Sequence, residues 1–131
     1  MRVFVYFNLR KHCFSVKALE GENKGRVIAH THDIELLAPR FKVSEAGRQR
    51  VLRERQKNVH AGVVGWYNSA VNVAKIGDAY ATTNVRYNPY VYSSFVDSNE
   101  KPIYIAATAH LTVKDKRPKI VASVYGVLND Q

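Results

Sequence analysis

The sequence predicts an α+β domain in which one long, basic, amphipathic helix packs on an antiparallel sheet. Three observations predict this fold. The first 43 residues alternate apolar and polar side chains in short runs, residues 44–60 are rich in helix formers, and the last third returns to extended patterns. The chain has 131 residues, 46% of them hydrophobic, which is enough for one core. We therefore expect residues 1–131 to form a single domain.

The N-terminal third is predicted to be an antiparallel β-meander. Residues 2–9 and 13–18 alternate with period two, as strands with one buried face do. The polar loop 20–25 has glycine near both ends, and its turn chemistry predicts a hairpin to a strand within 26–32. Residues 34–37 continue the pattern until Pro39, and residues 41–43 add a short extended segment. The result is a meander of four or five strands.

Ser44 marks a change of pattern. Its hydroxyl is a suitable helix N-cap, and Glu45 places an acidic side chain in the first helical turn. The predicted helix spans about 44–60. The chain is expected to leave it near Gly62 and Gly65. Residues 66–80 are ambiguous, and 69–76 fit either a second helix or an irregular crossing.

The last third is predicted to add a C-terminal group of antiparallel strands. Residues 84–87 and 90–96 flank the turn signal Asn88-Pro89. A long extended run at 102–113, a basic turn at 114–119 and a final strand at 120–127 follow.

The charge of the chain favours an anionic partner. Lysine and arginine number 20 against 11 acidic residues, which gives a formal charge of +9 and a pI of about 9.8. Nucleic acids, nucleotides and acidic surfaces attract such a protein. Residues 40–60 contain seven of these cations against two glutamates, so the positive charge concentrates in and just before the predicted helix.

The predicted helix divides its arginines between two environments. Arg50, Arg53 and Lys57 share a polar side with His60, whereas Arg48 and Arg55 fall within the apolar stripe. An arginine there must extend to solvent, pair with a carboxylate, or bind a ligand, and its planar fork suits phosphate. A solvated polar side and internally paired arginines remain the alternative interpretation.

Aromatic side chains crowd the segment that follows. Tyr87, Tyr90 and Tyr92 lie there, with Arg86 and Asn88 among them. Aromatic faces near cations are how proteins hold nucleobases beside phosphates. The same rings could instead build the sheet core or an oligomer interface.

No catalytic set is predicted. His110 and Thr112 match one half of the pattern of two-histidine phosphodiesterases, but the second half is missing, and His30 and His32 lack a local third metal ligand. We expect no metal and no cofactor. The single cysteine, Cys13, and the absence of an apolar run of about 20 residues predict a cytoplasmic protein without a membrane span.

Several strings resemble small accessory proteins of tailed bacteriophages. They are Glu-Ala-Gly-Arg-Gln-Arg-Val-Leu at 45–52 with Lys-Asn-Val-His-Ala-Gly at 57–62, Lys-Gly-Arg-Val-Ile-Ala-His at 24–30, and Tyr-Asn-Pro-Tyr at 87–90. Small β-rich phage proteins of this kind include counter-defence proteins such as the Thoeris anti-defence sponges. The resemblance implies a protein of the host cytoplasm that binds a cyclic oligonucleotide or cyclic ADP-ribose derivative and does not cleave it.

Together these features predict a non-enzymatic protein that sequesters a phosphate-bearing nucleotide signal. Arginines would hold phosphates, tyrosines would stack on a base, and Asn88 and His60 would contact polar edges. A subunit this small has little surface to enclose a ligand, so we expect a homo-oligomer. Two alternatives are a nucleic-acid-binding protein that uses the Arg-rich helix, and a protein–protein interaction module. The predicted ligand-binding residues are Arg48, Arg50, Arg53, Arg55, His60, Arg86, Tyr87, Asn88, Tyr90 and Tyr92.

Overall fold

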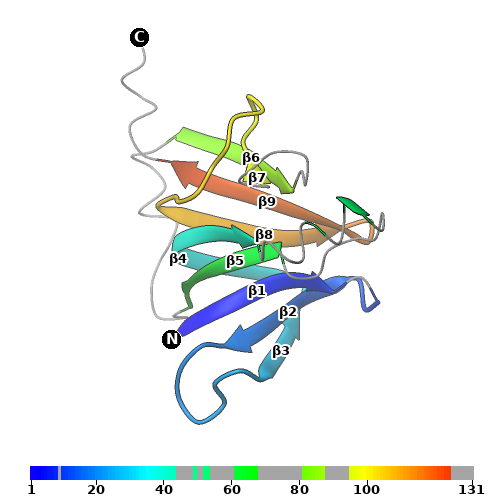
Figure 1. Cartoon of the computed structure of the whole chain (residues 1–131), viewed down its shortest axis with the longest axis vertical. Coiled ribbons are helices and arrows are strands. Elements are labelled where there is room, and N and C mark those ends of the chain that lie inside the picture. Colours follow the sequence, from blue (N-terminus) through cyan, green and yellow to red (C-terminus); the bar gives the residue numbers. More distant parts are fainter. Residues whose placement is uncertain are drawn as a thin grey trace.

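The computed structural model describes residues 1–8, 10–43, 49, 52–53, 61–67, 81–87 and 95–124. The described residues contain nine β-strands (Figure 1). The strands are β1 (Arg2–Asn8), β2 (Cys13–Ala18), β3 (Val27–Thr31), β4 (Asp33–Val43), β5 (Ala61–Trp66), β6 (Ala81–Tyr87), β7 (Phe95–Val96), β8 (Thr108–Lys114) and β9 (Arg117–Val124).

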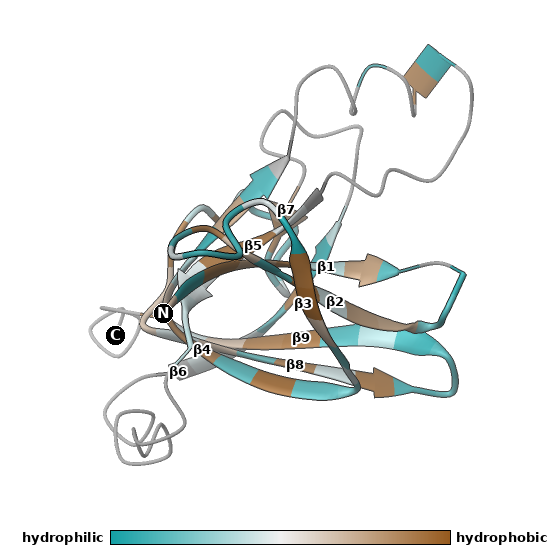
Figure 2. Ribbon diagram, turned by 90° about the horizontal axis from the view of Figure 1, so that it is seen from below, coloured by the Kyte–Doolittle hydropathy of each residue, from teal (hydrophilic) through white to brown (hydrophobic). Residues whose placement is uncertain are grey.

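All nine strands join one antiparallel sheet, in the order β3-β2-β1-β5-β4-β8-β9-β6-β7. Strands β3 and β4 are separated only by His32, although three other strands lie between them in this order. The sheet must therefore curl until the end of β3 reaches β8. The Val113 N–H accordingly donates to the His32 carbonyl at 3.0 Å. Figure 2 shows the strands curving round instead of lying in a flat layer.

The curl gives the sheet an inner and an outer face. Val3 and Val5 of β1 point inward, and their partners across the ladder are Ala18 and Val16 of β2. Because successive side chains of a strand alternate between faces, Phe4 and Tyr6 point outward. The inner face collects a core from both halves of the chain: Val3, Val5, Phe14, Val16, Ile34, Leu36, Phe41, Val63, Val85, Phe95, Ile103, Ala106, Ala109, Leu111 and Ala122.

Strand β4 passes through Pro39 without ending. The register of β4 against β5 shifts between Leu37 and Arg40, and Ala38 takes a positive φ of 48°. This is a β-bulge, in which one extra residue lets the strand bend. Pro39 cannot donate a ladder bond, but its carbonyl accepts from Ala106 N–H. The prediction of two separate segments at 34–37 and 41–43 is therefore wrong.

The α+β prediction is also wrong, because the described residues form a nine-stranded sheet and none of their elements is a helix. The sheet curls over its own apolar face, so a helix is not needed to cover the core. Residues 61–66, where the chain was expected to leave the helix, form β5, with Val63 inward. The predicted helix at 44–60 lies outside the described residues except for Gln49, Leu52 and Arg53, which have helical backbone. Residues 68–80 of the ambiguous segment also lie outside the described residues.

Most of the strand predictions are confirmed. Loop 20–25 connects β2 and β3 in a hairpin. Strand β6 includes all of 84–87, and β7, β8 and β9 occupy parts of 90–96, 102–113 and 120–127. The basic turn predicted at 114–119 is tighter than expected. Lys114 pairs with Arg117, so only Asp115 and Lys116 form the loop between β8 and β9.

This loop gives a prediction about stability. Asp115 and Lys116 have φ of 52° and 64°, which two-residue hairpin loops of type I′ require and which glycine adopts more readily than lysine. We expect Lys116→Gly to raise the free energy of unfolding by about 1 kcal/mol, because a lysine side chain in this conformation costs about that much. Urea unfolding measures the change. The matched control, Lys114→Gly in the strand, should lower stability, and a loss in Lys116→Gly would contradict the turn assignment.

Candidate functional site

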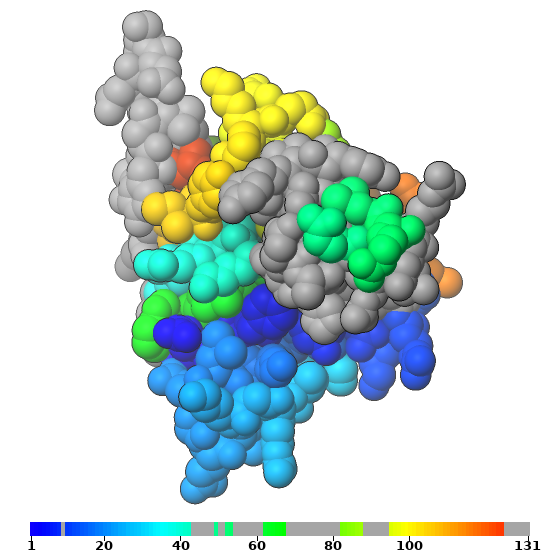
Figure 3. Space-filling model, viewed as in Figure 1, coloured from blue at the N-terminus to red at the C-terminus, as the bar shows by residue number. Residues whose placement is uncertain are grey.

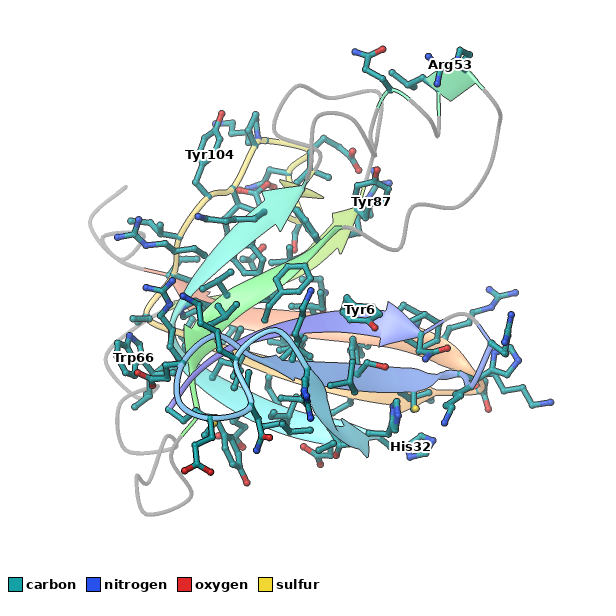
Figure 4. All side chains as sticks on the ribbon, turned by 60° about the horizontal axis from the view of Figure 1, so that its bottom comes forward. Tyr6, His32, Arg53, Trp66, Tyr87 and Tyr104 are labelled. Carbon is teal, nitrogen blue, oxygen red and sulfur yellow. The ribbon has the colours of Figure 1, made fainter. Side chains whose placement is uncertain are left out.

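Only three of the ten predicted ligand-binding residues lie within the described residues. They are Arg53, Arg86 and Tyr87, and Figure 4 labels the first and the last of them. The other seven lie outside the described residues: Arg48, Arg50, Arg55, His60, Asn88, Tyr90 and Tyr92.

Arg86 and Tyr87 do not share a site, because neighbouring residues of β6 point to opposite faces. Tyr87 is half-buried and packs edge-on against Phe95, with ring centroids 5.6 Å apart. Arg86 forms an exposed ion pair with Glu100. The hydrogen bond between them raises the pKa of Arg86 and lowers the pKa of Glu100. The charge of Arg86 is thus already balanced within the protein, and the Tyr87 ring packs against the core.

Of the histidines considered in the sequence, His30 and His110 have separate side-chain partners. His30 Nδ1 lies 3.1 Å from the buried Ser15 hydroxyl, and His32 occupies the bend between β3 and β4. His110 Nε2 lies 2.6 Å from Asp33 Oδ1, in an exposed pair between β8 and β4. Among the residues that the structure describes, no three His, Cys, Asp or Glu side chains are arranged to hold a metal ion.

An exposed surface on the outer side of β1, β5 and β4 combines aromatic and cationic side chains. Ladder pairing fixes its rows: Arg2 lies across from Trp66, Phe4 from Val64, and Val64 from Arg40. Because paired residues point to the same face, these side chains share the outer surface. Their inward neighbours Val3, Val63 and Phe41 are buried in the core, which confirms the assignment. We call this surface the Trp66 face; it comprises Arg2, Phe4, Arg40, Lys42, Val64 and Trp66.

Trp66 is the exposed ring of this face. Trp66 is 47% exposed, although tryptophan is highly buried on average. Figure 4 shows Trp66 at one margin of the sheet, with Arg53 on the opposite side of the view. Exposed Ile105 adjoins the face, since its backbone pairs with Arg40. In Figure 3, the segments around Trp66, Arg40 and Ile105 (green, cyan and yellow) come to the surface on the same visible side.

Gly62 makes room for the aromatic part of the face. A Cβ atom at this position would lie 2.7 Å from Cζ of Phe4 and 2.5 Å from the Val5 carbonyl oxygen. The Phe4 ring therefore lies close against the backbone of β5. Tyr6 continues the row of rings along β1, with its centroid 5.9 Å from that of Phe4.

The cations of the Trp66 face are available to a ligand. The side chains of Arg2, Arg40 and Lys42 take part in no ion pair with the described residues. Glu20 approaches only the backbone N–H of Arg2, at 2.7 Å. The acidic side chains of β4, Asp33 and Glu35, lie before the bulge, whereas Arg40 and Lys42 lie after it. The bulge thus divides β4 into an acidic half and a basic half.

Comparison with known proteins places the chain among phage proteins. The family model of the Mycobacterium phage L5 gene 82 protein matches residues 1–119. The chain belongs to the gene 82 protein family. The gene 82 protein of Mycobacterium phage L5 itself is 40% identical over 113 residues, which cover 82% of this chain and 86% of that protein. No solved structure matches the chain. The predicted resemblance to bacteriophage proteins is confirmed.

The matched region of this gene 82 family member includes all six residues of the Trp66 face. Sequence reasoning missed the face because it treated 61–66 as the exit from a helix. The adjacent β-branched residues Val63 and Val64, bounded by Gly62 and Gly65, were the available signal, since such short runs are typical of a strand. In the sequence, Arg40 and Lys42 contribute only to the count of cations in residues 40–60 and are not predicted to bind a ligand. Within the described residues, no helix is long and apolar enough to cross a membrane.

Proposed function

We propose that this gene 82 family protein sequesters a phosphate-bearing nucleotide ligand on its Trp66 face without changing it chemically. One observation supports this proposal above the others: an exposed indole shares a sheet face with three cations that the described residues leave without a carboxylate partner. Indole rings stack on nucleobases, and arginine binds phosphate oxygens through two parallel N–H donors.

The spacing of the face suits a nucleotide. Trp66 and Arg2 occupy one row, and Arg40 lies in the next, across from Val64. Rows on one face are two residues apart along a strand, which is about 7 Å. A base stacked on Trp66 can therefore bring its own phosphate, or the adjacent one, towards the guanidinium of Arg40.

Sequestration is the role that such a face supports in a phage protein. A bound nucleotide signal, such as a cyclic oligonucleotide or a cyclic ADP-ribose derivative, would be withheld from the host proteins that respond to it. The exposed Asp33–His110 pair lies in the acidic half of β4, and we assign it no chemical step. Assembly into a homo-oligomer and action in the host cytoplasm stay predictions, and native mass spectrometry tests the first of them.

The experiment uses the single tryptophan of the chain as its own probe. Titration with nucleotides should quench the fluorescence of Trp66, because a stacked base contacts the indole directly. Arg40→Ala should weaken binding between about tenfold and about 150-fold, as loss of one charged hydrogen-bond donor costs roughly 1.5–3 kcal/mol. The matched control is Arg117→Ala in the β8–β9 hairpin, which removes the same charge away from the face and should leave affinity unchanged. Equal effects of the two variants, or no quenching by any nucleotide, would reject the proposal.

A further inference from the structure

We infer that the ligand of the Trp66 face is single-stranded nucleic acid, bound along β4 and β5 as a segment of several nucleotides. This inference rests on the proposed function for the binding of phosphate-bearing nucleotides by this face, and it names a polymer in place of a small cyclic signal. Three features of the face carry it: its length, its open shape and the change of charge along β4.

The face is longer than one nucleotide. Leu37 of β4 pairs with Trp66, and Lys42 pairs with Gly62, so the distance between these rows is four residues of β5. At about 3.3 Å per residue this is about 13 Å. A stacked strand advances about 3.4 Å per nucleotide, so the face accommodates up to about four nucleotides. A single nucleotide that stacks on Trp66 and reaches Arg40 would leave Lys42 without a phosphate.

The face is open and lies on the outside of the curl. Small ligands are usually held in concave sites that bury most of their surface. The outer side of a curled sheet is convex across the strands, so a compact cyclic nucleotide would touch only a few side chains there. A single strand gains contacts by extending, and its unpaired bases are accessible to rings such as Trp66 and Phe4. A duplex keeps its bases stacked inside and offers a sheet face only its backbone.

The charge along β4 changes sign at the bulge. Arg40 and Lys42 lie between the bulge and the end of β4 at Val43. In the opposite direction along β4 come Glu35 and Asp33. A polyanion is therefore attracted over the basic half of β4 and repelled from the acidic half.

The inference predicts how affinity depends on ligand length and salt. Fluorescence anisotropy of labelled oligothymidylate and oligouridylate measures binding by the full chain, and unlabelled AMP and a cyclic dinucleotide compete. We expect a dodecanucleotide to bind at least about 100-fold more tightly than AMP. The slope of log K against log salt should be about −2, since single strands give about −0.7 for each of three neutralised phosphates. Arg40→Ala should make that slope shallower by about 0.7.

Trp66 variants test the stacking contact. Trp66→Ala should weaken oligonucleotide binding by about fivefold to about 150-fold, the range that alanine substitution of one stacking residue gives, and Trp66→Phe should retain most of the affinity. Circular dichroism of each variant confirms that it folds. Equal losses in both variants would show that the ring does not stack on a base.

The outcomes separate the inference from the proposed function. If AMP or the cyclic dinucleotide binds as tightly as the dodecanucleotide, the polymer inference is overturned and nucleotide sequestration stands. If a duplex of the same length binds as tightly as the single strand, the face contacts only phosphates, and the inference of a single-stranded ligand is wrong. If no nucleotide or nucleic acid binds, both are overturned, and a protein partner becomes the explanation for the face.

Discussion

Leu36→Ala is expected to lower the free energy of unfolding by about 2–5 kcal/mol, the range for removal of a buried leucine side chain. Leu36 is fully buried in the core inside the curl, paired with Ala109 of β8. Truncation loses its apolar transfer free energy and leaves a cavity that neighbouring strands fill only in part. Urea or thermal unfolding of the two proteins measures the difference.

The adjacent leucine is the matched control. Leu37 points to the outer face, where it lies across from Trp66 and is only half-buried. The same substitution there should cost about 1 kcal/mol or less, because less apolar surface is lost and no closed cavity forms. A shift of one residue in the register of β4 would exchange the two faces of the strand. If Leu37→Ala lowers the free energy of unfolding more than Leu36→Ala does, then Leu37 and not Leu36 points into the core. The residues assigned to the Trp66 face would then not share the outer surface.

The N-terminal strands could be predicted from the sequence because their alternation is local. Val3 and Val5 alternate with Phe4 and Tyr6 and show period two directly, and the loop at 20–25 carries its own turn signals. The curl could not be predicted in this way. It depends on the placement of β3 and β4, consecutive in the chain, with three strands between them in the sheet. Pairing between distant segments leaves no periodic signal within either one.

The fold class was mistaken for a related reason. Residues 44–60 are rich in helix formers and predict a helix that the chain leaves near Gly62 and Gly65. The residues of β5 therefore fall at the end of the predicted helix and are not recognised as a strand. The actual strand sits at the centre of the basic surface, between β1 and β4. Pro39 was likewise interpreted as the end of a strand, because proline removes a ladder donor. The bulge at Leu37 and Arg40 accommodates it and also separates the acidic half of β4 from the basic half.

The chemistry that we propose for the site can be reached from composition alone, whereas its location cannot. Net charge and aromatic content indicated a nucleotide or nucleic-acid partner, which is also the basis of the present proposal. The residues chosen were those that cluster along the sequence, such as Arg86 and Tyr87. In the fold these two are separated onto opposite faces and have partners of their own. The Trp66 face draws on three strands, and its residues become neighbours only through the ladder register.

Gly62→Ala is expected to reduce stability by about 1–3 kcal/mol, the usual cost of forcing extra atoms into a well-packed region. The new Cβ would lie 2.5 Å from the Val5 carbonyl oxygen, a backbone atom held in the β1 ladder. It would also lie 2.7 Å from the Phe4 ring and displace it from the Trp66 face. We therefore expect weaker oligonucleotide binding together with a lower unfolding midpoint.

Two further variants separate these effects. Gly65→Ala places its Cβ no closer than 3.0 Å to a neighbour, the Leu36 side chain, and should cost less than Gly62→Ala. Phe4→Leu in the Gly62→Ala background removes the ring atoms that clash but leaves the Val5 contact, so it should restore only part of the stability. A Gly62→Ala protein as stable as the original would mean that β1 and β5 do not approach as closely as the register requires. If Gly62→Ala is destabilised but binds oligonucleotides normally, the Phe4 ring takes no part in the ligand surface, and the contact area contracts to Trp66 and the three cations.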